Sequence, residues 1–117
     1  MHFKFEELQV YQKALDFVDL IYVVIQDLPK HEMYNLSSQF KRAAVSIALN
    51  TAEGHGSSNA QFNRYLQMAS NSLNECVVCS TVARRLHYIT IEQEKEIRTK
   101  LVELSKMIAG LQKYLRK

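Results

Sequence analysis

The sequence predicts an all-α protein that folds as an up-down-up-down antiparallel four-helix bundle. Its 117 residues contain one proline and three glycines, so few breaks in regular structure are expected. Four long segments show the apolar periodicity of helices, over about residues 7–28, 36–53, 59–88 and 91–115. The connections between them are short, which favours antiparallel neighbours. The length suits one domain, residues 1–117, around a single core.

The segment 7–28 carries two apolar rows at helical spacing. The first row comprises Leu8, Tyr11, Leu15, Val18, Tyr22 and Ile25. The second row comprises Val10, Ala14, Phe17, Ile21, Val24 and Leu28. Together they form an apolar arc that is wider than one partner helix covers, which is a first indication of self-association. Pro29 ends this helix, because the residue before a proline is disfavoured in the helical region.

The segment 36–53 mixes large and small apolar residues on one face. That face comprises Leu36, Phe40, Ala43, Ala44, Ile47 and Thr51. Its small side chains allow a neighbouring helix to approach closely. Asn35 is the expected N-cap of this helix. Gly54 is expected to adopt the left-handed conformation that commonly follows a helix end.

Capping residues define the last two helices. Ser58 with Gln61 and Thr90 with Gln93 have the spacing of capping boxes. The third helix is expected to bury the row Phe62, Tyr65, Leu66, Ala69, Leu73, Cys76, Ala83 and Leu86. The fourth follows a four-three alternation typical of a coiled-coil seam, through Ile97, Leu101, Leu104, Ile108, Leu111 and Leu115.

A row of polar residues shares one narrow face of the second helix. Its members are Gln39, Arg42, Ser46, Asn50 and Glu53, and the third helix adds Ser72 and Glu75. One interpretation places both sets in solvent. The other is a partly buried network in which Arg42 pairs with Glu75 or Glu53. Such a network would fix helix register or subunit docking more than it would add stability.

No residue pattern indicates a catalytic, metal or cofactor site. The Glu-x-x-His pair that di-iron bundles require does not occur. Cys76 and Cys79 fall in mid-helix among apolar neighbours, where reduced, buried and inert thiols are expected instead of a redox or zinc site. The segment from Gly54 to Ser58 follows a helix and lacks the Gly-Lys-Ser/Thr ending of a phosphate-binding loop.

Positive charge concentrates in the last third of the chain. Residues 1–83 have six basic and eight acidic residues, net −2, whereas residues 84–117 have nine and four, net +5. The candidate nucleic-acid contacts lie near the turn between the third and fourth helices, and they are Arg84, Arg85, Lys95, Arg98 and Lys100. Tyr88 lies between them, either to stack on a base or to close the core. A one-sided basic surface attracts phosphate or an acidic partner, and the alternative is an ordinary solvated face.

The N-terminal residues show no signal-peptide pattern. The longest uninterrupted apolar run, from Leu20 to Ile25, is too short to span a bilayer. A cytoplasmic location without membrane insertion is therefore expected.

Two stretches of the second helix, Arg42 to Ile47 and Asn50 to Gly54, match the sequence pattern of a known protein family. The spacing Ala69-x-x-Ser72-x-x-Glu75 supports the match. The chain resembles the four-helix-bundle proteins encoded in intervening sequences of bacterial 23S ribosomal RNA genes. The resemblance covers nearly the whole chain and departs at Thr51, where a bulkier apolar residue is expected. It implies a ring-like homopentamer. It also implies similarity to the accessory protein of diversity-generating retroelements, which pairs with a reverse transcriptase and binds nucleic acid through a basic surface.

The resulting expectation is a non-enzymatic, oligomeric bundle that binds RNA or DNA, or serves as adaptor to a nucleic-acid enzyme such as a reverse transcriptase. The first alternative is a protein-interaction scaffold that does not bind nucleic acid. The second is an uncharacterised enzyme, which would need a polar pocket near Glu53 and Glu75.

Overall fold

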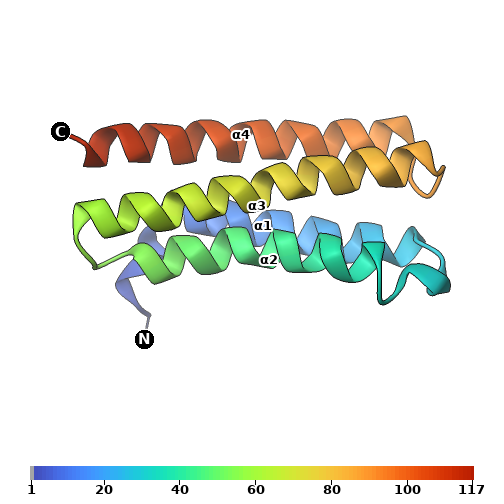
Figure 1. Ribbon diagram of the computed structural model, residues 1–117, viewed down its shortest axis with the longest axis horizontal. Helices are drawn as coiled ribbons and strands as arrows, with labels where there is room; N and C mark the ends of the chain where they lie inside the picture. Colours follow the sequence, from blue (N-terminus) through green and yellow to red (C-terminus); the bar gives the residue numbers. More distant parts are fainter. Residues whose placement is uncertain (1) are drawn as a thin grey trace.

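Four long helices form an elongated antiparallel bundle of 44 × 28 × 20 Å (Figure 1). The computed structural model describes residues 2–117. The α-helices are α1 (Gln9–Val24), α2 (Leu36–Gly54), α3 (Asn59–Arg85) and α4 (Ile91–Leu115). Short 3-10 turns flank α1, namely η1 (Lys4–Glu7), η2 (Ile25–Asp27) and η3 (Lys30–Glu32). The predicted all-α four-helix bundle is confirmed.

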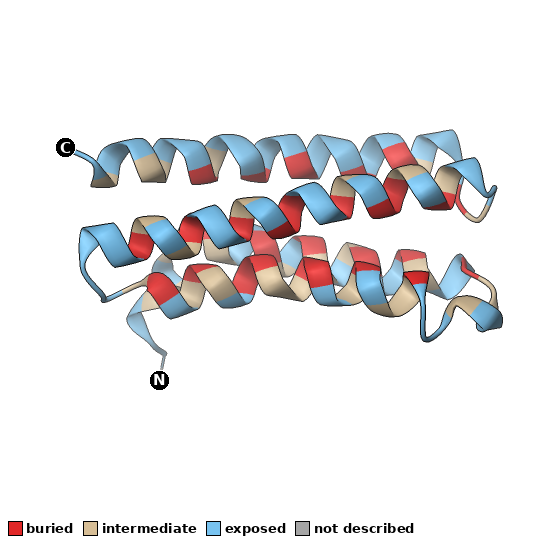
Figure 2. Ribbon diagram, viewed as in Figure 1, coloured by how far each residue is buried: buried red, intermediate tan, exposed pale blue. Residues whose placement is uncertain are grey.

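The core lies along the inner faces of all four helices (Figure 2). On α1 the second apolar row is buried, with Phe17 fully enclosed, whereas the first row is partly buried or, at Tyr22, exposed. On α4 the seam is buried from Ile97 to Ile108 and opens at Leu111 and Leu115. Thr51 is fully buried on the apolar face of α2, where its hydroxyl donates to the Ile47 carbonyl at 2.9 Å.

Two helices end earlier than their periodicity predicts. The α-helical part of α1 stops at Val24, and a 3-10 turn carries the chain to Pro29. Helix α3 stops at Arg85, because His87 adopts a left-handed φ of 63° and the Tyr88 N–H bonds the Ala83 carbonyl at 2.9 Å. These are the marks of a Schellman motif. Leu86, expected in the core, is consequently half exposed.

Gly54 has a different role from the predicted one. It is the last residue of α2, and the positive φ of the following turn, 86°, belongs to Gly56. A Cβ at Gly54 would lie 2.7 Å from the Tyr65 Cβ and 2.9 Å from Phe62 Cδ1. Gly54 is therefore required for the close approach of α2 to the start of α3.

The helix caps are confirmed at two of the three predicted positions. Ser58 accepts the Gln61 N–H, and Thr90 forms a full capping box with Gln93. Asn35 precedes α2 but makes no side-chain cap; instead Glu32 accepts the Leu36 N–H at 3.4 Å. Within residues 2–117, no helix combines the length and the hydropathy that crossing a membrane requires.

Candidate functional site

The centre of the predicted polar row cross-links α2 to α3. The Ser72 hydroxyl donates to Ser46 Oγ at 2.8 Å, and Asn50 Nδ2 donates to the same oxygen at 3.0 Å. Asn50 Nδ2 also donates to the Ser46 carbonyl at 2.9 Å. Ser72 is buried, and Ser46 and Asn50 are half-buried. This part of the row therefore sets the register between the two helices.

The charged members of the row do not join this network. Arg42, Glu53 and Glu75 are exposed, and in the described part of the chain Arg42 forms no ion pair. The predicted pairing of Arg42 with Glu75 or Glu53 is therefore wrong for the single chain. The reason is geometric: the short serine hydroxyls bring the helices together, and the longer charged side chains are left at the rim.

Arg42 and Glu75 instead line an open groove between α2 and α3. One hollow of about 540 Å³ is bounded by both residues and by Tyr34 and Leu86. A second, of about 410 Å³, continues along α3 over Val78 and shares Glu75. Across residues 2–117, no three His, Cys, Asp or Glu side chains converge on a point that could hold a metal ion.

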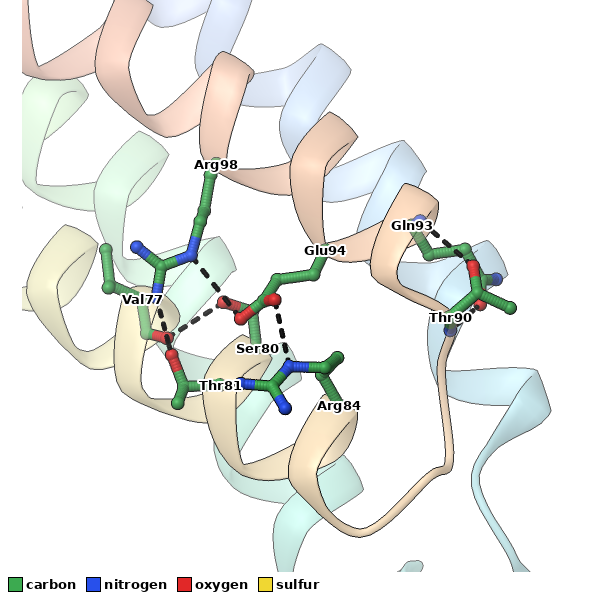
Figure 3. A network of polar contacts seen from close by, with 8 residues as sticks. All are labelled: Val77, Ser80, Thr81, Arg84, Thr90, Gln93, Glu94 and Arg98. Atoms are coloured by element: carbon green, nitrogen blue, oxygen red, sulfur yellow. Dashed lines mark hydrogen bonds and ion pairs between the residues drawn. The ribbon is translucent and has the colours of Figure 1, made fainter.

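A buried carboxylate organises the basic residues near the α3–α4 turn (Figure 3). Glu94 is 9% exposed; its Oε1 accepts from Arg84 Nε at 3.1 Å and its Oε2 from Arg98 Nε at 3.4 Å. Arg98 also donates to Thr81 Oγ1 at 2.7 Å. The structure thus brings Arg84 and Arg98 together, as the helical hairpin predicts. The sequence did not predict this bridging role of Glu94, although its position three residues before Ile97 places it on the seam.

The other three basic candidates are exposed but do not form one patch. Arg85 and Lys95 lie near the same turn as Arg84. Lys100 lies about 160° around α4 from Arg98, at 100° per residue. It shares that side with Glu103, which pairs with Lys13 of α1 at 3.6 Å. Four of the five candidates therefore lie at the α3–α4 end, and Lys100 faces α1.

Tyr88 ties the α3–α4 turn to the α1–α2 connection. Its hydroxyl donates to Glu32 Oε2 at 2.9 Å, and His31 Nε2 lies 3.3 Å from the same hydroxyl. The hydrogen bond to the Glu32 carboxylate, together with burial, raises the pKa of Tyr88. Gln93 makes a parallel tie to Asp27 at 2.9 Å. These contacts favour the closing of the bundle end over base stacking as the role of Tyr88.

The two cysteines are buried free thiols on the inner side of α3. Burial raises the pKa of Cys76, and burial raises that of Cys79 to about 11. Both are protonated at neutral pH and therefore unreactive, as their mid-helix position predicts.

Comparisons with known proteins agree with the fold and with the resemblance to a family. A family model described as 23S rRNA-intervening sequence protein matches residues 6–110. The chain belongs to this family. A crystal structure from Bacteroides thetaiotaomicron, of a protein with unknown function from the S23 ribosomal protein family, superimposes with a TM-score of 0.82. The two chains are 28% identical, and the match covers 89% of this chain and 98% of the other. No curated protein matches the chain.

Proposed function

We propose that this intervening-sequence protein is a non-enzymatic, oligomeric adaptor that binds the phosphate backbone of structured nucleic acid at the α3–α4 end. The supporting observation is the Arg84–Glu94–Arg98 cluster. One buried carboxylate holds two guanidinium groups in place, and neighbouring Arg85 and Lys95 are free to contact phosphate. These four cations and one anion carry a net charge of +3. Because Arg84 and Arg98 are already ordered, less side-chain entropy is lost on binding.

The proposal includes assembly into a homopentamer, as the resemblance implies. The apolar surface for this assembly is the α1–α2 face. It comprises Leu8 and Ile25 at the two ends of α1, Tyr11, Leu15, Val18 and Tyr22 within α1, and Val45, Leu49 and Ala52 of α2. Tyr22 is 45% and Leu49 58% exposed in the single chain. Repeating a modest phosphate contact around a ring raises the overall affinity without new contacts in each copy.

A charge-reversal pair tests the site. We expect Arg85→Glu with Lys95→Glu to abolish binding to a structured RNA, because each change replaces an attraction to phosphate with a repulsion. Lys100→Glu is the single-site control, since Lys100 faces α1. The readout is affinity across a salt series on protein of known native mass. Unchanged binding by the double variant would move the site elsewhere.

The α2–α3 groove favours a second candidate function, that of a protein-interaction scaffold. Arg42 and Glu75 are charged and unpaired in residues 2–117, and they flank the apolar Val78 and Val82. This arrangement suits an amphipathic helix that carries one acid and one base beside its apolar stripe. Capture of such a helix, lost in Arg42→Glu and accompanied by no salt-dependent RNA binding, would favour the scaffold over the adaptor.

A further inference from the structure

Five of the six basic residues from Lys95 to Arg116, on α4 and its C-cap, lie on one side of the helix, and the sixth, Lys100, lies on the side that faces α1. At 100° per residue, five of them fall within an arc of about 80°. We call this surface the basic flank; its members are Lys95, Arg98, Lys106, Lys113 and Arg116. All five are exposed. From Lys95 to Arg116 the flank is about 31 Å long, at 1.5 Å per residue.

The acids of α4 occupy a different side. Glu92, Glu96 and Glu103 fall within an arc of about 40° that adjoins the basic flank. The ion pair between Glu103 and Lys13 shows that this acidic side turns toward α1. The bond from Arg98 to Thr81 shows that the basic flank turns toward α3. The remaining acid, Glu94, is buried and already paired with two arginines.

Neutral amides of α3 border the distal half of the basic flank. Gln112 of α4 donates to Gln67 Oε1 at 3.4 Å, and Gln67 donates to Asn71 Oδ1 at 3.1 Å. The only acid of α3 is Glu75, and it lines the groove toward α2 instead. Gln67 is exposed beside Gln112 of α4, so it presents a polar group to a ligand that lies on the flank, whereas Asn71 also lines the α2–α3 groove beside Glu75. A phosphate chain on the α3 side of the flank would therefore meet cations and the Gln67 amide, with the exposed acids of α4 on the other side of the flank.

These observations rest on the proposed nucleic-acid function and extend it to a ligand class. We infer that the basic flank, with the amide of Gln67, binds the backbone of double-stranded RNA regardless of sequence. If α4 entered a groove of the nucleic acid, phosphates would lie on both of its sides. The exposed acids of α4 would then face the phosphates of one strand. An open surface suits this helix better, and A-form RNA offers a wide, shallow minor groove lined by 2′-hydroxyls. Those hydroxyls can form hydrogen bonds with the amide of Gln67 on α3.

Single strands fit this surface less well. Proteins that bind single strands stack bases on exposed aromatic rings. The exposed ring of α4, Tyr114, lies on the acidic side, about 100° around the helix from Lys113. The basic flank thus offers charge and hydrogen bonds without a stacking platform, which favours a duplex.

The test compares two charge-matched triple variants of the full chain. One removes the distal half of the flank, with Lys106→Gln, Lys113→Gln and Arg116→Gln. The control removes three exposed lysines elsewhere, with Lys4→Gln, Lys30→Gln and Lys100→Gln. Each binds a blunt RNA duplex of about 16 bp, the span of known double-stranded-RNA modules. We expect the flank variant to lose about 2–3 units of the slope of log affinity against log salt, one for each phosphate contact removed, and the control to retain it.

The possible results distinguish failure of this inference from failure of the proposed function. No binding by the unmodified protein at low salt to the RNA duplex or to any other structured nucleic acid would overturn both this inference and the proposed function. Binding to another structured nucleic acid but not to the duplex would overturn this inference alone. Binding to other structured RNA, with an unchanged salt slope in the flank variant, would overturn the flank alone. Equal losses in both variants would mean that net charge, not position, attracts the duplex, and would overturn the flank. Equal affinity for duplex DNA, single-stranded RNA or polyglutamate would overturn the double-stranded RNA assignment.

Discussion

At the scale of single residues, three features depend on tertiary contacts or on backbone conformation. Side chains of α3 pack against Gly54, the backbone of His87 is left-handed, and the thiols of Cys76 and Cys79 are buried. Each makes a prediction that does not depend on the function of the protein.

Gly54→Ala is expected to destabilise the protein by about 1–3 kcal/mol, the usual cost of overpacking. The added methyl group would meet the Cβ of Tyr65, which cannot move without α3. The measurement is urea unfolding followed by far-UV circular dichroism. Gly110→Ala is the matched control: space at Gly110 is open, and it lies inside α4, so alanine should stabilise by about 0.5–1 kcal/mol. Equal effects at both positions would contradict the packing role of Gly54.

His87→Gly is expected to stabilise the protein by about 1 kcal/mol, because glycine adopts the left-handed conformation at little steric cost. His87 is exposed, so its side chain loses little packing. Urea unfolding again provides the measurement, and His87→Ala, which keeps the Cβ, should not stabilise. Stabilisation by alanine equal to that by glycine would show that the backbone conformation is not the cause.

Alkylation of Cys79 is expected to be far slower in the native protein than in urea at about pH 8.5, the ordinary pKa of a thiol. Burial favours the neutral thiol and raises the pKa of Cys79 to about 11. The stability that the buried neutral thiol contributes is therefore complete below the pKa of the unfolded chain, and it is lost as the pH rises toward 11. Mass spectrometry of iodoacetamide-treated protein measures the rate. Rapid native labelling would contradict the burial of this thiol.

At the scale of elements, side-chain ties at the α3–α4 turn hold the bundle end together. Glu94 joins the two helices of the hairpin, and Tyr88 joins their turn to η3. The first contact is a cluster of charged groups, and the second is a hydrogen bond from a tyrosine hydroxyl. Substitutions can remove each of them without the other.

Glu94→Gln is expected to destabilise the protein by about 1–3 kcal/mol, because two guanidinium groups lose their shared anion. The two arginines are partly exposed, so water offsets part of the loss. The control is Glu96→Gln, an exposed position of α4 that should change stability by less than about 0.5 kcal/mol. A loss at Glu94 no greater than that at Glu96 would mean that the cluster is incidental.

Tyr88→Phe is expected to lower the urea midpoint, since Glu32 loses the hydrogen bond from the tyrosine hydroxyl. Tyr34→Phe is the control, because Tyr34 is 88% exposed. The raised pKa of Tyr88 adds a pH dependence. The tie is complete below about pH 10, the ordinary tyrosine pKa, and is lost as the pH rises through the higher folded value. A midpoint difference between Tyr88→Phe and the unmodified protein that persists at still higher pH would contradict this account.

At the scale of the whole molecule, the bundle presents three separate surfaces. The α1–α2 face is apolar, the α2–α3 groove is mixed, and the α3–α4 side is basic. Their separation allows assembly and ligand binding to be tested independently. In the proposed homopentamer Leu49 would lie between subunits, so Leu49→Glu is expected to bury a charge there and to reduce the native mass measured by light scattering. Val102→Glu, on an equally exposed apolar residue of α4, should leave the mass unchanged. Loss of assembly by both, or by neither, would remove the α1–α2 face as the interface.

Hydrophobic periodicity and capping residues by themselves determined the four helices and most of their apolar faces, because these depend on local sequence. The short connections predicted the antiparallel order. They also predicted that Arg84 and Arg98 lie in one helical hairpin, and that Ser46 and Asn50 lie on a helix next to the one that carries Ser72. Only the tertiary structure decided which apolar row of α1 enters the core, since both rows satisfy the helical period. It likewise decided that Glu94 is buried, that Arg42 has no ion-pair partner within residues 2–117, and that Lys100 turns toward α1. The physical reason is that burial and pairing depend on which helix lies beside each face, and spacing along one helix does not specify its neighbour.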